Sequence, residues 1–466
     1  MRFYFALIMA KMAKFAIKIV GKWKNFGGSN YPGELAMKLC PDYLDKINKP
    51  ETIVMVTGTN GKTTLCNMIT DMLEMSGKKV LTNRLGSNML PGMATSFTDG
   101  VGLGNKTDYE IAILEMDERS AIRIFPKLQP DYLVVTQLAR DSCRRNAHPH
   151  YIFSVINNSL PSKTKLILNG DDIIGSRLGT GREGIQDNPR VYYTIDRQED
   201  DKAEDKNIIN DMRVCPNCYS NLEFDYIRYN HVGKAHCPSC GMSSPDGDYR
   251  IKKIERDKGK ILVEGKDAPA EYRIINDSIF NIYNELAAIS FLSEVGIPQE
   301  RIIAAVEKTE IVDTRYKRET VEGIELISEI AKGQAAAGIS VVCEYLTEDP
   351  RPKELIFIIE DEENAGKSSE NFSYIYDTDF EFLTKANIVN VVTVGARSKD
   401  LCLRMMLAGL PERIMNPVKS IDEVTDKLLM EEGVDIHILY DNYEVAKNFR
   451  TRDLIKEKLR GGKANV

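Results

Sequence analysis

Long apolar runs are scarce in this chain of 466 residues. A helix that crosses a membrane needs roughly 18 or more consecutive apolar residues, and no segment beyond the N-terminus comes near that length. Excess positive charge is also absent, because the net charge is −7, which argues against a general nucleic-acid binder. We therefore expect a cytoplasmic protein whose length suits about three globular domains.

The N-terminal segment is apolar, but lysines interrupt it. Lys11, Lys14 and Lys18 break the run, which argues against a secretory signal peptide or a membrane span. The large apolar residues fall alternately three and four apart, at Phe5, Ile8, Met12, Phe15 and Ile19. This spacing predicts an amphipathic helix that docks on the protein, with peripheral contact at the inner face of the membrane as the alternative interpretation.

Cysteine is sparse and unevenly placed. There are nine cysteines, an odd number, and five are scattered, which indicates reduced thiols rather than a disulfide framework. The other four form two Cys-Pro-x-Cys pairs separated by 18 residues, Cys215 with Cys218 and Cys237 with Cys240. Four thiolates at this spacing fill a tetrahedral site and leave no position for a catalytic water, so we expect a structural zinc. His236 could compete as a ligand but breaks the paired spacing, and a redox pair would not need duplication.

The sequence does contain a phosphate-binding pattern. The apolar run Ile53 to Val56 predicts a buried strand, and helical spacing from Leu65 to Met75 predicts a helix after the glycine-containing turn. Val56 stands where the standard P-loop has its first glycine. A strand, a tight loop and a helix N-terminus together form an anion site, in which Lys62 reaches the β- and γ-phosphates and the hydroxyl of Thr63 binds Mg²⁺. The expected ATP-binding residues of this loop are Gly58, Thr59, Asn60, Gly61, Lys62, Thr63 and Thr64.

Three further groups of polar residues are candidates for the same site. The acidic run Glu115 to Glu118 ends an apolar strand, and Glu115 is the expected Mg²⁺ ligand because the carboxyl ends of parallel strands lie beside the phosphate loop. Thr136 to Asp141 also follows a strand. Asn281 and Asn284 share one helix face and suit hydrogen bonding to a nucleotide. The alternatives are a solvated strand end for the acidic run and solvated or capping positions for the asparagines.

The order of expected elements predicts the fold class α/β. Apolar strands alternate with helices from residue 51 onwards, which is the rhythm of a doubly wound parallel sheet. We expect an N-terminal helical segment over 1–50, an ATP-binding domain over 51–314 with a zinc-ribbon insertion over about 205–265, and a smaller C-terminal α/β domain over 315–466.

Taken together, these motifs resemble the Mur ligase superfamily, which activates carboxylates as acyl phosphates. They are most similar to the branch formed by the synthetase (MurT-type) subunits of lipid II isoglutaminyl synthase, and the resemblance runs over nearly the whole chain. It rests on Gly27–Gly33, the G-T-N-G-K-T-T loop, Asn83–Met89, Leu114–Glu118, Thr136–Asp141, Leu168–Asp172, the four-cysteine insertion, Ile282–Asn284, Tyr374–Glu381 and Gly395–Arg404. The inserted zinc ribbon separates this branch from other Mur ligases.

The resemblance implies an ATP-dependent amide synthesis. The α-carboxylate of the D-isoglutamyl residue in the lipid II stem peptide would be phosphorylated, and ammonia would then attack to give D-isoglutamine. It also implies a separate GatD-type glutaminase as the source of ammonia. The sequence agrees, because a glutaminase needs a nucleophilic cysteine, typically in a glycine-flanked elbow, and none of the scattered cysteines has glycine on both sides. These are Cys40, Cys66, Cys143, Cys343 and Cys402.

The sequence departs from this branch at two places. The family's C-terminal domain offers an aspartate to the partner's active site within D-x-S-W-I-W-D, and here the segment runs from Asn371 to Asp377, so its first aspartate is an asparagine. An amide can orient a histidine but cannot stabilise an imidazolium as a carboxylate does. Either Asp377 or Glu370 therefore takes the role of the missing aspartate, or the coupling to glutamine hydrolysis is weakened. The linker Phe-Gly-Arg-x-Glu is altered as well, and Arg315, Lys317 and Arg318 are the candidates for binding the γ-phosphate.

Two other functions fit the same motifs. One is a Mur-type ligase that joins an amino acid rather than ammonia. The other is a nucleotide-binding scaffold without catalysis, in which Asn371 marks lost coupling.

Overall fold

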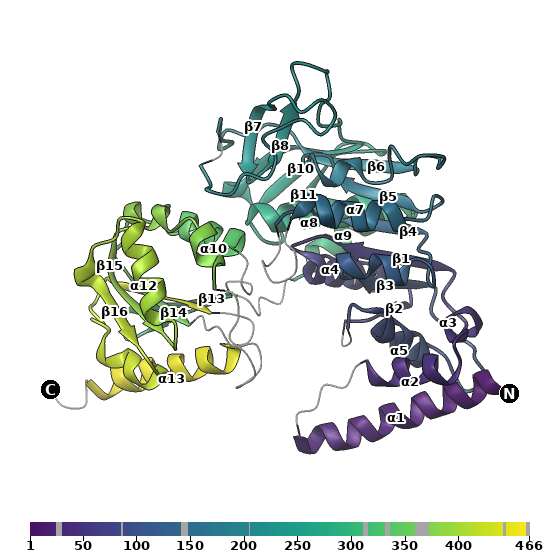
Figure 1. Cartoon of the computed structure of the whole chain (residues 1–466), viewed down its shortest axis with the longest axis horizontal. Helices are drawn as coiled ribbons and strands as arrows, with labels where there is room; N and C mark the ends of the chain where they lie inside the picture. Colours follow the sequence, from purple (N-terminus) through teal and green to yellow (C-terminus); the bar gives the residue numbers. More distant parts are fainter. Residues whose placement is uncertain are drawn as a thin grey trace. The chain divides into compact units, whose positions relative to one another are not determined.

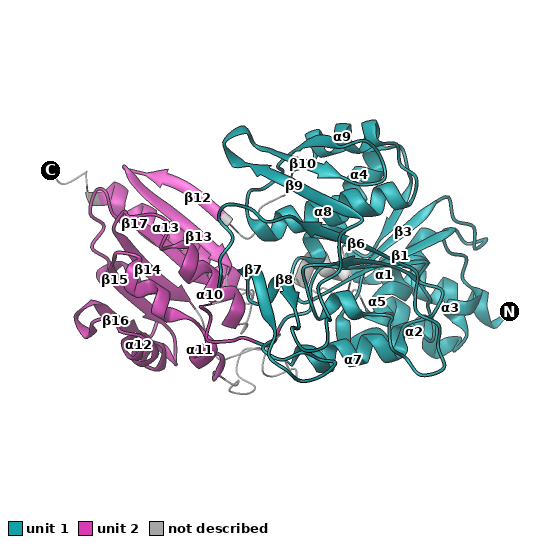
Figure 2. Cartoon of the chain, turned by 90° about the horizontal axis from the view of Figure 1, so that it is seen from above, with its two compact units in different colours: residues 1–139, 148–205, 211–311 teal, residues 140–147, 206–210, 312–466 magenta. Residues whose placement is uncertain are grey.

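The computed structural model of the chain describes residues 1–24, 30–84, 87–140, 148–204, 206–310, 316–330, 336–358, 372–440 and 444–462 (Figure 1). The chain divides into two compact units (Figure 2). Unit 1 comprises residues 1–139, 148–205 and 211–311, and unit 2 comprises residues 140–147, 206–210 and 312–466. Each unit is an α/β structure built on its own sheet, so the expected fold class is confirmed.

Unit 1 is built on a nine-stranded sheet in the order β11-β10-β9-β6-β5-β4-β1-β3-β2. Neighbouring strands are parallel along the stretch β2-β3-β1-β4-β5-β6-β9 of this order. At the other edge, β10 and β11 are added antiparallel. The strands are β1 Thr52–Thr57, β2 Val80–Thr82, β3 Ile111–Glu115, β4 Tyr132–Val135, β5 Lys165–Asn169, β6 Arg190–Ile195, β9 Tyr249–Glu255, β10 Lys260–Glu264 and β11 Ala270–Arg273.

Helices cover both faces of this sheet, as a doubly wound fold requires. Alternate residues of one strand enter different cores, since Val54 and Val56 pack on one side and Met55 on the other. The first core includes helices α4 (Lys62–Met75), α8 (Ile279–Glu294) and α9 (Gln299–Lys308). The second includes α5 (Leu90–Gly100), α6 (Ala121–Ile124) and α7 (Pro149–Ser159), together with the N-terminal helices.

The N-terminal segment forms helix α1 (Arg2–Lys24), which lies along α2 (Tyr31–Leu39) in Figure 1. The short helix α3 (Tyr43–Lys46) follows α2. The helix docks on the protein as expected, but through a different face. Its buried side chains are Phe3, Ala6, Leu7 and Ala10, because the two alanines admit close helix packing and Phe3 stacks 5.3 Å from the ring of Tyr43. The predicted apolar stripe from Phe5 to Ile19 faces outward. In the part of the chain that the structure describes, no helix is both long and apolar enough to span a bilayer.

The four-cysteine insertion is a separate hairpin of β7 (Glu223–Tyr229) and β8 (Val232–His236). The insertion is shorter than expected, because the strands after Tyr249 extend the large sheet instead of belonging to a ribbon that reaches residue 265. The burial of these strands explains the difference. Buried residues alternate with less buried ones along them, and the buried ones, among them Tyr249, Ile251 and Val263, belong to the same core as α8.

Two buried ion pairs tie this hairpin to the end of β5. Arg228 lies 2.8 Å from a carboxylate oxygen of Asp171, and Nε2 of His231 lies 3.0 Å from one of Asp172. The same Asp171 accepts hydrogen bonds from the backbone N–H of Ile195 and the hydroxyl of Tyr283. Buried carboxylates of this kind are stable only when paired and hydrogen-bonded, so they fix the orientation of the hairpin.

Unit 2 contains a six-stranded sheet in the order β12-β13-β17-β14-β15-β16, parallel except for β12. Two apolar cores lie on its two faces. The elements are β12 Tyr316–Val321, β13 Ile324–Ile330, α10 Ala336–Tyr345, β14 Lys353–Ile358, α11 Tyr374–Asp377, β15 Ile388–Val394, α12 Ser398–Leu407, β16 Met415–Val418, β17 Asp435–Tyr440 and α13 Val445–Gly462.

A buried carboxyl group on α8 makes the stability of the chain depend on pH. Burial raises the pKa of Glu285 to about 8, while one oxygen accepts the backbone N–H of Ile275 and the other has no partner among the described residues. In the unfolded chain this group ionises near pH ~4.3. The folded state therefore binds the extra proton, and its stability falls as the pH rises from about 4.3 to about 8.

Glu285→Gln should consequently melt at a higher temperature than the wild type near pH 8, and this advantage should shrink near pH 5.5. The upper limit of the effect is about 1.4 kcal/mol per pH unit in the window. Thermal unfolding followed by circular dichroism at the two pH values measures it. Glu300→Gln, at an exposed position on α9, controls for the loss of a charge. Equal shifts for Glu285→Gln at both pH values would contradict the assignment.

Candidate functional site

The loop between β1 and α4 has a backbone that only glycine adopts easily. Gly58 and Gly61 have φ angles of +126° and +83°. A Cβ atom on Gly58 would lie 2.1 Å from the hydroxyl of Thr136, and one on Gly61 would lie 2.7 Å from Oδ1 of Asn284. Because α4 begins at Lys62, the loop leads directly into a helix N-terminus, whose N–H groups and dipole favour an anion.

The same loop is fixed to the segment after β4. The backbone N–H of Thr59 donates to the carbonyl oxygen of Gln137 at 2.8 Å. The side-chain hydroxyl of Thr59 donates to the carbonyl oxygen of Ala139 at 3.0 Å. The Thr136 hydroxyl donates to the carbonyl of Asn60 at 2.6 Å. The segment that the sequence placed in the same cleft therefore supports the loop from outside, and it holds the peptide groups in place before any ligand arrives.

Lys62 is buried beside a carboxylate that the sequence did not single out. Its Nζ lies 2.8 Å from Oε1 of Glu118 and 2.5 Å from the carbonyl oxygen of Gly58. The lysine and glutamate side chains are only 10% and 7% exposed. Burial lowers the pKa of Lys62, but the charge and hydrogen bond of Glu118, together with the charges of Glu115 and Asp117, outweigh this and the pKa is raised. Lys62 is thus held protonated, with an internal counter-ion.

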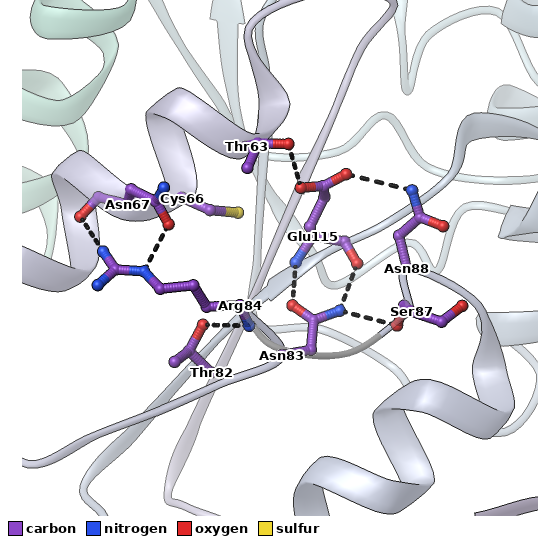
Figure 3. Close-up of a pocket in the computed structure, with 9 residues that line it drawn as sticks. All are labelled: Thr63, Cys66, Asn67, Thr82, Asn83, Arg84, Ser87, Asn88 and Glu115. Atoms are coloured by element: carbon purple, nitrogen blue, oxygen red, sulfur yellow. Dashed lines mark hydrogen bonds between the residues drawn. The ribbon is translucent and has the colours of Figure 1, made fainter. Parts of the chain in front are cut away.

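Glu115 faces the first turn of α4 (Figure 3). The hydroxyl of Thr63 donates to Oε2 of Glu115 at 2.7 Å, and the side-chain amide of Asn88 donates to Oε1 at 3.1 Å. The side chain of Asn83 makes two hydrogen bonds of 2.9 Å to the backbone of Glu115. Its amide nitrogen donates to the Glu115 carbonyl, and its amide oxygen accepts from the Glu115 N–H. The structure thus brings together the two residues expected to bind Mg²⁺.

This arrangement opens into a polar pocket. The lining residues come from α4, from the end of β2 and from the end of β3, and are Thr63, Cys66, Asn67, Thr82, Asn83, Arg84, Ser87, Asn88 and Glu115. Asn83 and Asn88 were assigned no role from sequence. Asn83 directly follows the apolar strand β2, and this position is the signal that could have identified it, whereas Asn88 lies six residues after the strand.

The two helix asparagines have different positions. Asn284 is 4% exposed and lies against Gly61 of the loop. Its side-chain amide donates to Asn281 at 3.3 Å, and Asn281 in turn donates to Asn276 at 3.0 Å. Asn284 therefore contacts the phosphate loop, whereas Asn281 lies one hydrogen bond behind it. Thr64 is half-buried in the first turn of α4.

The remaining candidate residues belong to unit 2 or are not described. Asp377 ends α11, and one of its carboxylate oxygens lies 3.6 Å from a guanidinium nitrogen of Arg140, which is part of the same unit. The Asp377 side chain is 36% exposed. Asn371 and Arg315 lie outside the described residues.

The four paired cysteines form one cluster. All four Sγ atoms lie within 4.8 Å of one another, with Cys215 and Cys240 3.6 Å apart and Cys218 and Cys237 3.5 Å apart. A tetrahedral ion with sulfur bonds of about 2.3 Å separates its ligands by about 3.8 Å, so the cluster has a size consistent with zinc.

Two matching turns hold the cluster. In each turn the residue after the second cysteine has a positive φ, +62° at Tyr219 and +75° at Gly241. The backbone N–H of that residue donates over 2.9 Å to the carbonyl of the first cysteine of its pair. The two halves of the site are therefore built alike, as paired metal-binding knuckles are.

Comparison with known proteins matches both units. Residues 56–214 match the Mur ligase middle domain, and residues 334–444 match the MurT ligase C-terminal domain. The chain is 31% identical over 440 residues to the lipid II isoglutaminyl synthase (glutamine-hydrolyzing) subunit MurT of Staphylococcus aureus, covering 94% of this chain and 95% of that one. It is 27% identical to the subunit of the same name from Streptococcus pneumoniae, covering 97% and 98%.

Solved structures agree on the fold. A pseudomurein peptide ligase type C from Methanothermus fervidus superposes with a TM-score of 0.67 at 20% identity, covering 89% of this chain and 81% of that one. MurF from Acinetobacter baumannii gives 0.62 at 13% identity, covering 91% and 80%.

The cysteine cluster predicts a metal content that a variant can remove. Cys240→Ser should lower bound zinc from about one equivalent to well below half, because three thiolates hold the ion more weakly than four. Elemental analysis of the purified chain measures this. Cys402→Ser, at a buried cysteine of unit 2, is the matched control and should keep the full metal content. Equal zinc in both variants, or no metal in the wild type, would refute a metal site here.

Proposed function

The chain belongs to the MurT family of Mur-type ligases, and from that premise we propose that it is the ATP-dependent synthetase subunit of a lipid II isoglutaminyl synthase. The reaction phosphorylates the α-carboxylate of the D-isoglutamyl residue in the lipid II stem peptide. Ammonia then displaces the phosphate to give D-isoglutamine. The observation that carries the proposal is the similarity over 94% of the chain to subunits named for this activity, together with an intact phosphate loop.

The residues around the loop suit the formation of an acyl phosphate. The glycine backbone and the N-terminus of α4 bind the phosphate oxygens, while Asn284 supports the loop at Gly61. Lys62 carries the positive charge that neutralises the transferred phosphoryl group, and it exchanges Glu118 for that group when ATP binds. Arg315 adds a further positive charge at the γ-phosphate in this proposal.

Thr63 and Glu115 are the residues that would hold Mg²⁺, since their side-chain oxygens are already 2.7 Å apart. The bound ion would neutralise charge on the phosphates. Asn83 and Asn88 hold the backbone and carboxylate of Glu115 in the orientation that faces Thr63.

For the cysteine cluster we propose structural zinc. Four thiolate ligands at tetrahedral spacing suit zinc and leave no open position for a reactant. In this proposal the metal joins the turn before β7 to the turn after β8 and so closes the hairpin.

We also propose a glutaminase partner that supplies ammonia, because the chain has no glycine-flanked cysteine of its own. The word "subunit" and the term "glutamine-hydrolyzing" in the names of the relatives support this. We propose the cytoplasm as the site of the reaction, because ATP is available there.

The decisive assay supplies purified chain with ATP, Mg²⁺ and lipid II, and then adds either ammonium or amino acids. Amide formation from ammonium with no incorporation of an amino acid supports the proposal, and incorporation would indicate an amino-acid ligase instead. Lys62→Ala should lower amide formation by at least about a hundredfold, because the transferred charge loses its main counter-charge. Lys78→Ala removes an exposed lysine paired with Glu110 and should leave the rate unchanged. A wild-type chain that never turns over ATP would leave only the scaffold function.

Asp377 provides a separate test of coupling to the partner. It is the carboxylate left in the segment where Asn371 replaces the family's aspartate, and we propose that it orients the histidine of the glutaminase. Asp377→Asn should lower glutamine-driven amidation by at least about tenfold and leave ammonium-driven amidation within about twofold. Glu381→Gln, which changes a partly exposed carboxylate paired with Arg404, should alter neither rate. An equal loss with both nitrogen sources would rule out this role for Asp377.

A further inference from the structure

Helix α1 presents a row of large apolar side chains to solvent. The exposed fractions are 57% for Phe5, 45% for Ile8, 59% for Met12, 67% for Phe15 and 51% for Ile19. Scattered single apolar residues are normal on a surface, but five in one continuous row along a helix are not. The row therefore requires an explanation beyond the fold.

The docked face of α1 prevents this row from turning inward. At about 100° per residue, the buried residues Phe3, Ala6, Leu7 and Ala10 lie on the side of the helix opposite the row. Lys11 adds a second restraint, because its Nζ donates to the carbonyls of Thr98 and Val101 at 2.8 and 2.7 Å. The helix cannot bury the row against unit 1 without leaving these contacts.

The charge of the helix is as distinctive as its apolar row. Residues 1–24 contain six basic and no acidic residues, in a chain whose net charge is −7. The basic residues are Arg2, Lys11, Lys14, Lys18, Lys22 and Lys24. Lys18 is exposed, and Lys14, also exposed, lies on the docked side of the helix and pairs with Asp99 of α5. An exposed apolar row on a helix that carries only basic charges is the pattern of a helix that lies in a membrane interface.

We propose that α1 is a docking surface for an anionic lipid bilayer, with its axis parallel to the membrane and the row from Phe5 to Ile19 inserted among the headgroups. A second copy of the chain fits less well, because stacking two such helices would bring two basic segments together, whereas anionic lipid matches both the apolar row and the charge. The proposal rests on α1 alone and does not depend on the ligase activity. It places the catalytic unit beside a substrate that is itself lipid-linked.

Vesicle flotation with the full chain tests the proposal. Wild-type protein should bind vesicles of phosphatidylcholine with about 30% phosphatidylglycerol at least tenfold more than vesicles of phosphatidylcholine alone, and the difference should fall at high salt. The variant F5S/M12S/F15S should lose at least tenfold of this binding. Its matched control is I122S/L403S/L407S, which removes three exposed apolar side chains elsewhere and should bind as the wild type does.

Trp23 gives a second measurement, because it is the only tryptophan of the chain and belongs to α1. Its emission should shift to shorter wavelength with anionic vesicles and should be quenched by brominated lipids. An unchanged melting temperature shows that the triple variant is folded. With ammonium as nitrogen source, the variant should amidate detergent-solubilised lipid II at the wild-type rate and lose activity only on vesicle-embedded substrate.

Three outcomes would overturn the proposal. The first is no binding of wild-type chain to anionic vesicles, and the second is equal binding by the triple variant. The third is a triple variant that changes the oligomeric state, or loses a co-purifying protein, while vesicle binding is unchanged, since the row would then be covered by protein. None of these outcomes touches amidation of the solubilised substrate, so failure of the docking surface and failure of the proposed activity are distinguishable.

Discussion

The candidate site depends on the position at which β1, β3 and β4 end. Because these strands are parallel, their carboxyl ends meet at one edge of the sheet, and the chain leaves each of them through a polar segment. The loop after β1 supplies Lys62, the end of β3 supplies Glu115, and the segment after β4 supplies Thr136, which holds the loop. No single segment contains the site, and the sheet is what brings its parts together.

Much of this could be predicted from the sequence because the signals are local. An apolar strand, two glycines and a helix define the loop within thirteen residues, and the conformations of Gly58 and Gly61 explain why those glycines are present. The paired cysteines are equally local, since each turn is closed by its own hydrogen bonds. The fold class followed from the alternation of strands and helices.

The parts that were missed depend on tertiary packing. Glu118 lies in an acidic run in which any member could face the loop, and only the turn after β3 directs it at Lys62. The docked face of α1 consists of Phe3, Ala6, Leu7 and Ala10, so half of it is alanine, and a search for the longest row of large apolar residues selects Phe5 to Ile19 instead. The strands after Tyr249 carry polar residues on one side, which is also the pattern of a small polar lobe, although they continue the large sheet.

The contact between Lys62 and Glu118 has a consequence for selectivity among anions. A buried lysine that already has a counter-ion gains little from chloride, because this ion merely replaces one negative charge by another. A polyphosphate also engages the glycine backbone and the N-terminus of α4, so it brings contacts that chloride lacks. Glu118 therefore competes with any anion that binds to Lys62. An anion occupies the loop only when its other contacts outweigh the loss of this ion pair.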